Sequence, residues 1–404
     1  MQYEYSATKD SWLQKAMFAK DKKQYLSQWR DKYEKIDTDL DFNQFEFIPN
    51  SSDILVNLPA LSFMLRVPFK LQKPYLSKDD RTFHILDNPV RKDKVFQVPM
   101  VAPSSWKGAL QMAMFQQFAE WWCSLDEQVK TQHQYKKEFV AKRISIGRIF
   151  GTEKGFEIDL KKCESYLDNL GDQKLAIWYK RYVRRYVSPT GFFSGRLYFY
   201  PTFFDKLSLE VINPHDRKKG TSARGPIYLE CVPKDAKGEF VVLYVPLGKV
   251  DEPQVFQDLE LLVQGIKAML TVYGFGAKTS SGFGVVDDQL YSPGKLTIRA
   301  EIPELKKIQV SPEQKEFLND DGSLKQDFLN DDGSFKSESQ YKKFLQKQNK
   351  PHNSTLYKKV KQWYEENRQR VASNSDLITS QSFNSLSELG DRAQQIIKNL
   401  TENQ

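Results

Sequence analysis

The order of the apolar segments along the chain is the feature that most limits its possible folds. Alternating or continuous apolar residues predict strands over 60–71, 195–200, 226–232, 240–246 and 283–286. Apolar residues at helical spacing predict helices over 103–122 and 256–272. Four of these five strands, together with both helices, give the order strand, helix, strand, strand, helix, strand. It predicts an α+β fold with a ferredoxin-like core, the plan of RNA-recognition-motif modules.

The remaining segments are predicted to be additions to this core, which we place at 51–290. Residues 1–50 predict an N-terminal helical extension, 123–187 a helical insertion, and 291–404 a polar, mainly helical C-terminal extension. The last segment contains two copies of Asn-Asp-Asp-Gly-Ser, at 319–323 and 330–334. Neither copy has the spaced oxygen ligands and closing glutamate of a calcium loop, so paired turns are the preferred interpretation.

Composition limits the class of protein. The 404 residues include 60 basic and 52 acidic side chains, a net charge of +8 that is compatible with binding a polyanion. The 3 cysteines lie far apart and only 4 histidines are present, which argues against a structural zinc site and a disulfide scaffold. No apolar run of about 18 residues and no signal segment occurs. We expect a cytoplasmic protein without a membrane partner.

A glycine-rich segment at 273–286 is the first candidate binding site. Glycine lets the backbone approach a ligand, and a neighbouring lysine favours an anion. The P-loop pattern fails because Ala277 occupies the glycine position before Lys278. A nucleic-acid backbone is therefore as good a ligand as a nucleotide, and a plain glycine-rich hairpin stays open as an alternative. The predicted binding residues are Gly274, Gly276, Lys278, Thr279, Ser280, Ser281 and Gly282.

The start of the helix at 103–122 is the second candidate. Ser104, Ser105 and Lys107 match the Ser-x-x-Lys pattern of serine acyl enzymes, but the partner motifs of those enzymes are absent. The serines are predicted to cap the helix. A helix N-terminus with two serines and a lysine favours phosphate binding, which we prefer to nucleophilic catalysis.

Basic residues interleaved with aromatic residues form a third candidate. Over 178–186, Arg181, Arg184 and Arg185 alternate with aromatic rings, a pattern that suits single-stranded nucleic acid. A helix with an inward aromatic face and a solvated cationic face explains the pattern equally well. A polar basic loop over 213–220 is long enough to project, and His215 within it is a weak candidate for acid–base catalysis.

Four aspartates, Asp79, Asp80, Asp87 and Asp93, follow the first predicted strand. A carboxylate beside an RNA backbone can orient a 2′-hydroxyl for attack on phosphorus, or hold Mg²⁺ there. Spacing alone does not choose between these roles. A loop that the aspartates merely solvate stays open as an alternative.

The runs at 86–93 and 98–110 resemble the RAMP proteins of type III CRISPR effector complexes, most closely their backbone subunits. In that family an Asp-x-Pro-[Val/Ile] loop precedes a Pro-Gly-Ser-Ser-x-Lys-Gly helix start. The segments 149–152 and 195–197 resemble two further family blocks, and 274–284 resembles the glycine-rich loop. Counting the runs at 86–93 and 98–110 as one block, the four blocks occur in the family's order over about 55–288.

The resemblance implies a modified RNA-recognition fold that binds the backbone of CRISPR RNA. It implies partners: CRISPR RNA, target RNA, other RAMP-type subunits and the large subunit of the complex. It implies a cleaving aspartate at Asp87, which would cut target RNA with Mg²⁺ or another divalent cation. We expect neither zinc nor a nucleotide as a cofactor. A projecting thumb hairpin matches 211–226, with Ile212, Asn213, His215, Arg217, Lys218, Lys219 and Arg224.

The sequence also departs from the family pattern. Pro103 stands where glycine is common, and 1–50, 123–187 and the segment after 290 have no counterpart in a minimal subunit. Two alternatives therefore stay open: a non-catalytic capping subunit that binds the guide end, and a stand-alone precursor-RNA processing endonuclease that uses His215 or His84. Our prediction is an insertion-bearing effector subunit that acts as an endoribonuclease within the complex.

Overall fold

A five-stranded antiparallel sheet forms the centre of the protein. The computed structural model describes residues 34–35, 48–78, 88–96, 98–152, 165–212, 227–248, 251–300, 314–318, 324–328, 330, 335–347, 354–372 and 378–402. The sheet order is β10-β9-β2-β8-β4, and every neighbouring pair is antiparallel. The strands are β2 (Phe63–Lys70), β4 (Leu197–Phe199), β8 (Lys237–Tyr244), β9 (Gln289–Ile298) and β10 (Thr379–Ser385). The predicted mixed α and β composition is confirmed.

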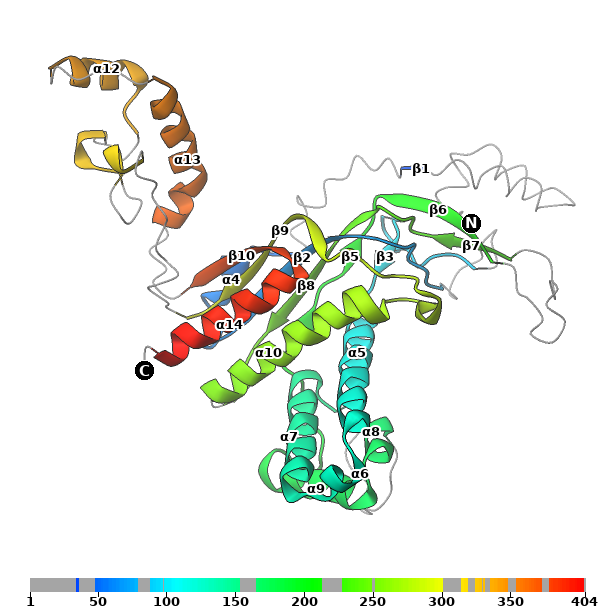
Figure 1. The fold of residues 1–404 in the computed structure, drawn as a ribbon. Coiled ribbons are helices and arrows are strands. Elements are labelled where there is room, and N and C mark those ends of the chain that lie inside the picture. Colours follow the sequence, from blue (N-terminus) through cyan, green and yellow to red (C-terminus); the bar gives the residue numbers. More distant parts are fainter. Residues whose placement is uncertain are drawn as a thin grey trace, which may run out of the picture.

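The two faces of the sheet follow from the alternation in β2. Phe63, Leu65, Val67 and Phe69 are fully buried and belong to the main core. That core includes residues of three helices: α5 (Pro103–Ser124), α10 (Glu252–Ala268) and α14 (Leu386–Glu402). Figure 1 shows α10 and α14 running side by side over this face. On the opposite face, Met64 packs with Leu55 of the short helix α4 (Ser51–Leu55).

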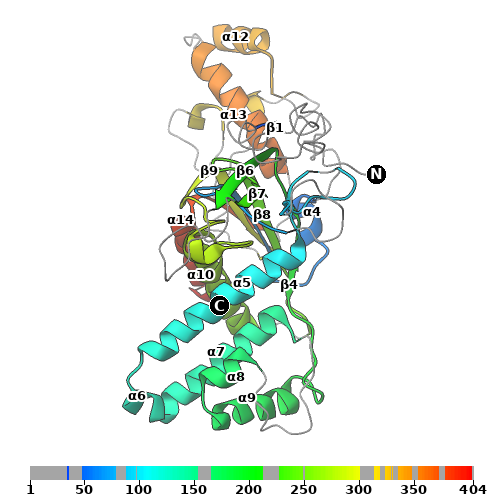
Figure 2. The same ribbon diagram turned by 90° about the vertical axis from the view of Figure 1, so that its right-hand side faces the viewer.

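The helices predicted between 123 and 187 are present in the described part of that segment. They are α6 (Glu127–Thr131), α7 (His133–Phe150), α8 (Tyr166–Leu170) and α9 (Gln173–Tyr186). Together they form a helical lobe below the sheet in Figures 1 and 2. A fully buried carboxylate, Asp258 of α10, joins the lobe to the core: it accepts hydrogen bonds from Arg148 of α7, at 2.6 Å, and from Tyr244 of β8, at 2.6 Å.

The segment after residue 290 differs from its prediction as a polar, mainly helical extension. β9 pairs with the central strand β2, with Leu296 opposite Leu65, and β10 pairs with β9. Phe383 and the α14 residue Leu389 are fully buried in the main core. The strand prediction failed here because Pro293 and Gly294 interrupt the apolar pattern of β9, and the edge strand β10 is largely polar.

The short strand predicted at 283–286 is also wrong. Val286 forms only an isolated bridge to Leu71, because Gly284 adopts a positive φ of 71° and ends the extended backbone.

A separate small core lies between 314 and 372. It contains the short 3₁₀ turns η4 (Gln314–Glu316) and η5 (Gln326–Phe328), with α12 (Glu338–Lys347) and α13 (Ser354–Ala372). Phe317 and Phe328, which precede the two Asn-Asp-Asp-Gly-Ser copies, pack with ring centroids 4.9 Å apart. The duplicated segments therefore each contribute an aromatic ring to one core.

Two further strand pairs lie outside the main sheet. β3 (Met100–Val101) pairs with β5 (Thr202–Phe203), and β6 (Lys206–Ile212) pairs with β7 (Ile227–Cys231). The short strand β1 (Glu34–Lys35) adds to the edge of β6. Of the described helices, none combines the length and apolar composition needed to cross a membrane.

Candidate nucleic-acid interface

The glycine-rich loop is attached to the segment that follows β2. It begins after a π-helical turn, η2 (Met269–Tyr273), that extends α10. The Ala277 N–H donates to the Leu76 carbonyl at 2.7 Å, and the Gly284 N–H donates to the Pro74 carbonyl at 2.9 Å. The Gln72 N–H donates to the Val285 carbonyl at 2.9 Å. The loop is therefore held in one place by backbone hydrogen bonds.

Three of the glycines are required by packing within the protein. Gly274 has a φ of 73°, and a Cβ there would lie 2.5 Å from the Phe283 carbonyl oxygen. Gly276 and Gly284 have φ values of 92° and 71°, and a Cβ at either would collide with a backbone carbonyl oxygen, of Leu76 and Phe275 respectively. Gly282 differs, because a Cβ there would lie 2.8 Å from the Lys73 ammonium nitrogen. The absence of a side chain at Gly282 thus leaves room for Lys73, a cation that is not among the predicted site residues.

The tip of the loop presents the groups that suit an anion. Lys278 has a left-handed backbone with φ 59°, and the 3₁₀ turn η3 (Thr279–Ser281) follows it. Within the described part of the chain, the backbone N–H groups of Lys278, Thr279 and Ser280 donate to no other residue. Lys278, Ser280 and the nearby Lys73 are exposed. Backbone N–H groups in succession beside cations form an anion-binding concavity.

Buried aromatic rings pack the start of α5 against the glycine-rich loop. Trp106 is fully buried in the first turns of α5, and its ring centroid lies 4.4 Å from that of Phe275 in the glycine loop. Its indole Nε1 donates to the Thr202 hydroxyl at 3.0 Å. The structure therefore brings together the two predicted phosphate sites, which lie far apart in the sequence.

The serines at the α5 start are not caps, which corrects the prediction. The N-cap is Ala102, which has no side-chain cap, and Pro103 occupies the first helical position without an N–H group. The Ser105 N–H already donates to the Ala102 carbonyl at 2.9 Å. Ser104 is exposed, while Ser105 and Lys107 are half-buried. A phosphate at this helix end would therefore depend chiefly on the Ser104 N–H, the hydroxyl groups and Lys107.

The base of the β6–β7 hairpin packs against the glycine loop. Leu76, Leu229 and Cys231 form a buried cluster with Ala277 and Phe283 of the loop. Burial, together with the nearby carboxylates of Glu210 and Glu230, raises the pKa of the Cys231 thiol, so Cys231 is a packing residue and no nucleophile.

A buried ion pair attaches the segment after Asp87 to this hairpin. The Lys92 ammonium donates to both carboxylate oxygens of Glu230, at 2.8 and 2.7 Å, and the Val90 N–H donates to the same carboxylate at 3.0 Å. The Glu230 N–H donates to the Asn88 carbonyl at 3.0 Å. The Glu230 side chain has no exposed surface and that of Lys92 only 4%. Residues 88–92 are thus attached to β7, beginning with Asn88, the residue directly after Asp87.

Several predicted site residues lie outside the described residues: Asp87, Asn213, His215, Arg217, Lys218, Lys219 and Arg224, with the alternative residue His84. Asp93 is described, and its carboxylate accepts the N–H groups of Val95 and Phe96 at 2.8 and 2.9 Å, as in a local turn. Among the described residues, no three His, Cys, Asp or Glu side chains are grouped so as to hold a metal ion.

The three predicted arginines of α9 do not join the glycine loop. Figures 1 and 2 place α9 at the far end of the helical lobe, away from the β6–β7 hairpin. Arg181 and Arg185 are exposed, and Arg184 is half-buried. The structure thus separates the predicted RNA-binding residues into two surfaces.

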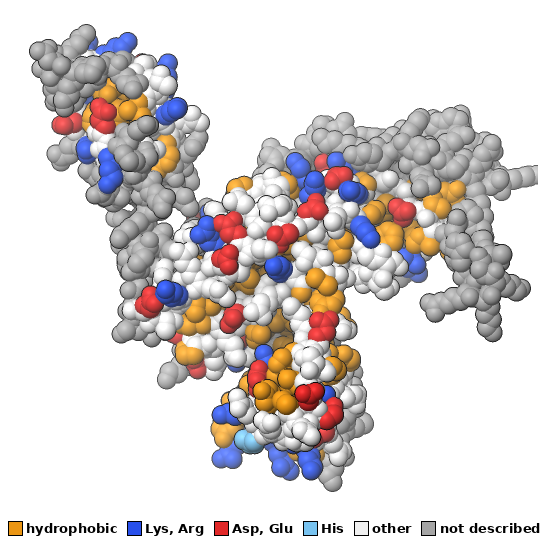
Figure 3. Space-filling view, viewed as in Figure 1, with side chains coloured by type: hydrophobic (Ala, Val, Ile, Leu, Met, Phe, Trp, Pro, Cys, Tyr) orange, Lys and Arg blue, Asp and Glu red, His pale blue; other side chains and the backbone are white. Residues whose placement is uncertain are grey.

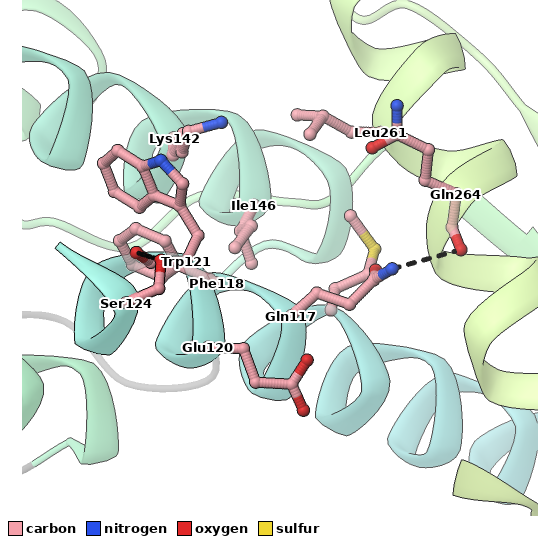
Figure 4. A pocket seen from close by; sticks show the side chains of 10 residues that line it. Gln117, Phe118, Glu120, Trp121, Ser124, Lys142, Ile146, Leu261 and Gln264 are labelled. Atoms are coloured by element: carbon pink, nitrogen blue, oxygen red, sulfur yellow. Dashed lines mark hydrogen bonds between the residues drawn. The ribbon is translucent and has the colours of Figure 1, made fainter. Parts of the chain in front are cut away.

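A groove of about 540 Å³ lies at the root of the lobe, between α5, α7 and α10 (Figure 4). Its two charged side chains already have neighbours. The Lys142 ammonium lies 4.9 Å from the Trp121 ring centroid, and Glu120 accepts the Tyr273 hydroxyl at 2.9 Å. Burial, the hydrogen bond to Glu120 and its charge raise the pKa of Tyr273 to about 12.

A model of one protein family matches more than half of the chain. The RAMP superfamily profile matches residues 69–287. The chain is similar to a chain of the cryo-EM structure of the Type III-B Cmr-beta bound to cognate target RNA, with 13% identity and a TM-score of 0.35. That match covers 63% of this chain and 66% of the other.

A second similarity is to a chain of a CRISPR RNA-guided surveillance complex in a pre-nicking state, with 9% identity and a TM-score of 0.32. It covers 78% of this chain and 90% of the other. No curated protein sequence matches the chain. Both TM-scores lie below 0.5, so the family assignment depends on the profile match.

Proposed function

Since this chain belongs to the RAMP superfamily, we propose that it is a subunit of a type III CRISPR effector complex that binds the backbone of the guide RNA. The observation that carries the proposal is the contact of Trp106 with Phe275, which joins the α5 start to the glycine loop. The order β9-β2-β8-β4, with all pairs antiparallel, also supports the ferredoxin-like plan of RNA-recognition modules.

The proposed contact is with phosphate groups. The N–H groups at 278–280 donate to no described residue, and backbone hydrogen bonds attach their loop to residues 72–76. We therefore expect the loop to need little ordering when RNA binds. Lys278 and Lys73 supply positive charge at the glycine loop, and Lys107 supplies it at the start of α5. Such contacts position RNA and carry no sequence information, which suits a protein that must accept any guide.

Lys107→Ala and Lys278→Ala are each expected to weaken retention of the guide RNA. Each lost phosphate contact lowers the slope of log affinity against log salt by about one unit. The measurement purifies the complex through this chain at several salt concentrations, then extracts, sequences and quantifies the bound RNA. Wild-type protein is expected to hold CRISPR RNA of uniform length.

Lys398→Ala is the control for this experiment. Lys398 lies on α14, its side chain is 70% exposed, and it pairs only weakly with Glu402 at 3.7 Å. Equal RNA retention and equal salt slope in all four proteins would contradict the phosphate-binding site. Unrelated cellular RNA in the wild-type complex would contradict the effector function itself.

The β6–β7 hairpin is the proposed thumb, which would wedge between guide and target. Its base is packed on the glycine loop, so a rigid hairpin would extend from the site that binds the guide. Shortening the connection between Ile212 and Ala223 is expected to preserve guide binding but to shift the position of target cleavage. Mapping the cut ends of labelled target RNA checks this, and unchanged cut positions would contradict the role.

Cleavage of target RNA is assigned to Asp87, as an endoribonuclease activity of the assembled complex. A carboxylate there would orient or deprotonate a 2′-hydroxyl for attack on the adjacent phosphate. We expect a divalent cation such as Mg²⁺ to be required. The described residues contain no set of metal ligands, so no step is assigned to the metal. The proposed partners are guide RNA, target RNA and the other subunits.

A further inference from the structure

Helix α9 has an unusual charge for a surface helix. Its sequence, QKLAIWYKRYVRRY, contains five cationic and no acidic side chains. One of the five belongs to the interior, because the Lys180 side chain is only 8% exposed and lies 3.2 Å from the Asp168 carboxylate. Figure 3 shows Lys and Arg side chains gathered along the free end of the lobe, where α9 lies in Figure 1.

Two rows of side chains run along the outer face of α9. Arg181 and Arg185 form one row, and Tyr182 and Tyr186 form the next, and the members of each row are four positions apart. Side chains four residues apart lie on the same helix face, about 6 Å apart along its axis. A cationic row thus runs directly beside an aromatic row.

The tyrosine rings of this face lie in solvent. Tyr182 is 38% and Tyr186 64% exposed, and their ring centroids are 4.9 Å apart. The Arg185 guanidinium lies 5.4 Å from the Tyr186 ring centroid. Six residues after the end of the helix, Phe192 is 58% exposed.

These tyrosines are not needed to attach α9 to the lobe. Leu175, Ala176, Tyr179 and Val183 are buried and form the inward face of the helix. The sequence left open whether the aromatic residues of this segment face inward or outward. The structure divides them, with Tyr179 inside and the Tyr182–Tyr186 pair outside.

We propose that this outer face of α9 is a second RNA-binding surface, specific for unpaired RNA. Arginine side chains would neutralise successive phosphates while the tyrosine rings stack on bases. Stacking needs a base whose face is open, which a continuous duplex does not offer. The strong positive charge favours a polyanion over an apolar protein segment as the occupant. The inference rests on the proposed RNA-binding function, but its surface lies apart from the glycine loop.

The test uses the purified full-length chain and a fluorescently labelled pyrimidine-rich RNA, either single-stranded or annealed to its complement. Tyr182→Ala combined with Tyr186→Ala is expected to weaken single-strand binding about 10-fold or more, because each stacked base contributes substantially to affinity. The affinity for duplex and the salt slope should stay unchanged. Arg181→Ala combined with Arg185→Ala should lower the salt slope by about two units.

Matched control variants test whether any loss of RNA affinity is specific to the outer face of α9. Tyr166→Ala removes a tyrosine of similar exposure, 49%, from α8, and Lys137→Ala removes an exposed cation from α7. Neither is expected to change single-strand affinity. Alanine favours helix, and thermal unfolding should confirm that all variants stay folded. Equal affinity of the tyrosine variant and wild type for single strands would overturn the proposal.

Two further outcomes would also overturn it: an equal loss for duplex RNA, or a defect confined to assembly with protein subunits, which would make the face a protein interface. The two proposals can fail separately. If Lys278→Ala loses the guide while the tyrosine variant binds single strands normally, only the α9 inference is wrong. If the tyrosine variant loses single strands while Lys107→Ala and Lys278→Ala keep the guide, only the glycine-loop site is wrong.

Discussion

Asp87→Ala is expected to abolish target-RNA cleavage by the assembled complex while leaving the guide in place. A positioned acid–base group contributes about 10²–10⁴-fold to rate, enough to remove a product band from a gel. Asp87 immediately precedes Asn88, whose carbonyl oxygen accepts the Glu230 N–H at 3.0 Å, so the chain next to it is anchored to β7. The measurement is denaturing electrophoresis of labelled target RNA incubated with wild-type and variant complexes.

Asp87→Asn is the matched substitution, because it keeps the size of the side chain and removes its charge and basicity. It is expected to be as inactive as Asp87→Ala, with guide RNA content unchanged. A complex that still makes every cut with either variant would identify this chain as a non-catalytic capping or structural subunit. Cleavage that needs no metal and is lost with His215→Ala or His84→Ala would instead favour a precursor-RNA processing endonuclease.

Glu230→Ala is expected to have the largest effect on stability. The substitution leaves the Lys92 ammonium buried without its carboxylate and the Val90 N–H without its acceptor. Breaking a buried ion pair by removing one partner costs about 3–5 kcal/mol. Because the chain has more than one core, local stability is the suitable quantity. Hydrogen exchange at 88–92 and 229–231 should show the loss, with little change in α14.

A double substitution supplies the control for this prediction. Glu230→Leu combined with Lys92→Met removes both charges and fills the site with apolar side chains, a replacement that is often neutral or stabilising. We expect the double variant to recover most of the protection that Glu230→Ala loses. A loss below about 1 kcal/mol in Glu230→Ala would show that the pair is solvated, as surface pairs are.

Features that depend on short stretches of chain were determined by the sequence. The alternation in β2 and the helical spacing in α5 and α10 each repeat over a few residues, so their apolar faces could be predicted with nearly correct bounds. The position of the glycine loop followed in the same way, because a left-handed backbone is a local property of glycine.

Features that depend on partners far along the chain were decided only by the tertiary structure. β9 contains Pro293 and Gly294, and it is a strand because β2 and β10 pair with both of its edges. The Gly294 backbone also leaves room for the Phe383 ring, a contact that no local pattern announces.

The candidate site divides in the same way. Lysines, serines and glycines suited to phosphate could be predicted from residue type and spacing alone. Two contacts could not be predicted in this way: Trp106 packs on Phe275, and Glu230 pairs with Lys92. The partners are 169 and 138 residues apart in the sequence and meet only in the folded protein. Burial explains both kinds of contact. A buried carboxylate is costly unless a cation pairs with it, and a glycine packed against a carbonyl oxygen leaves no space for a side chain.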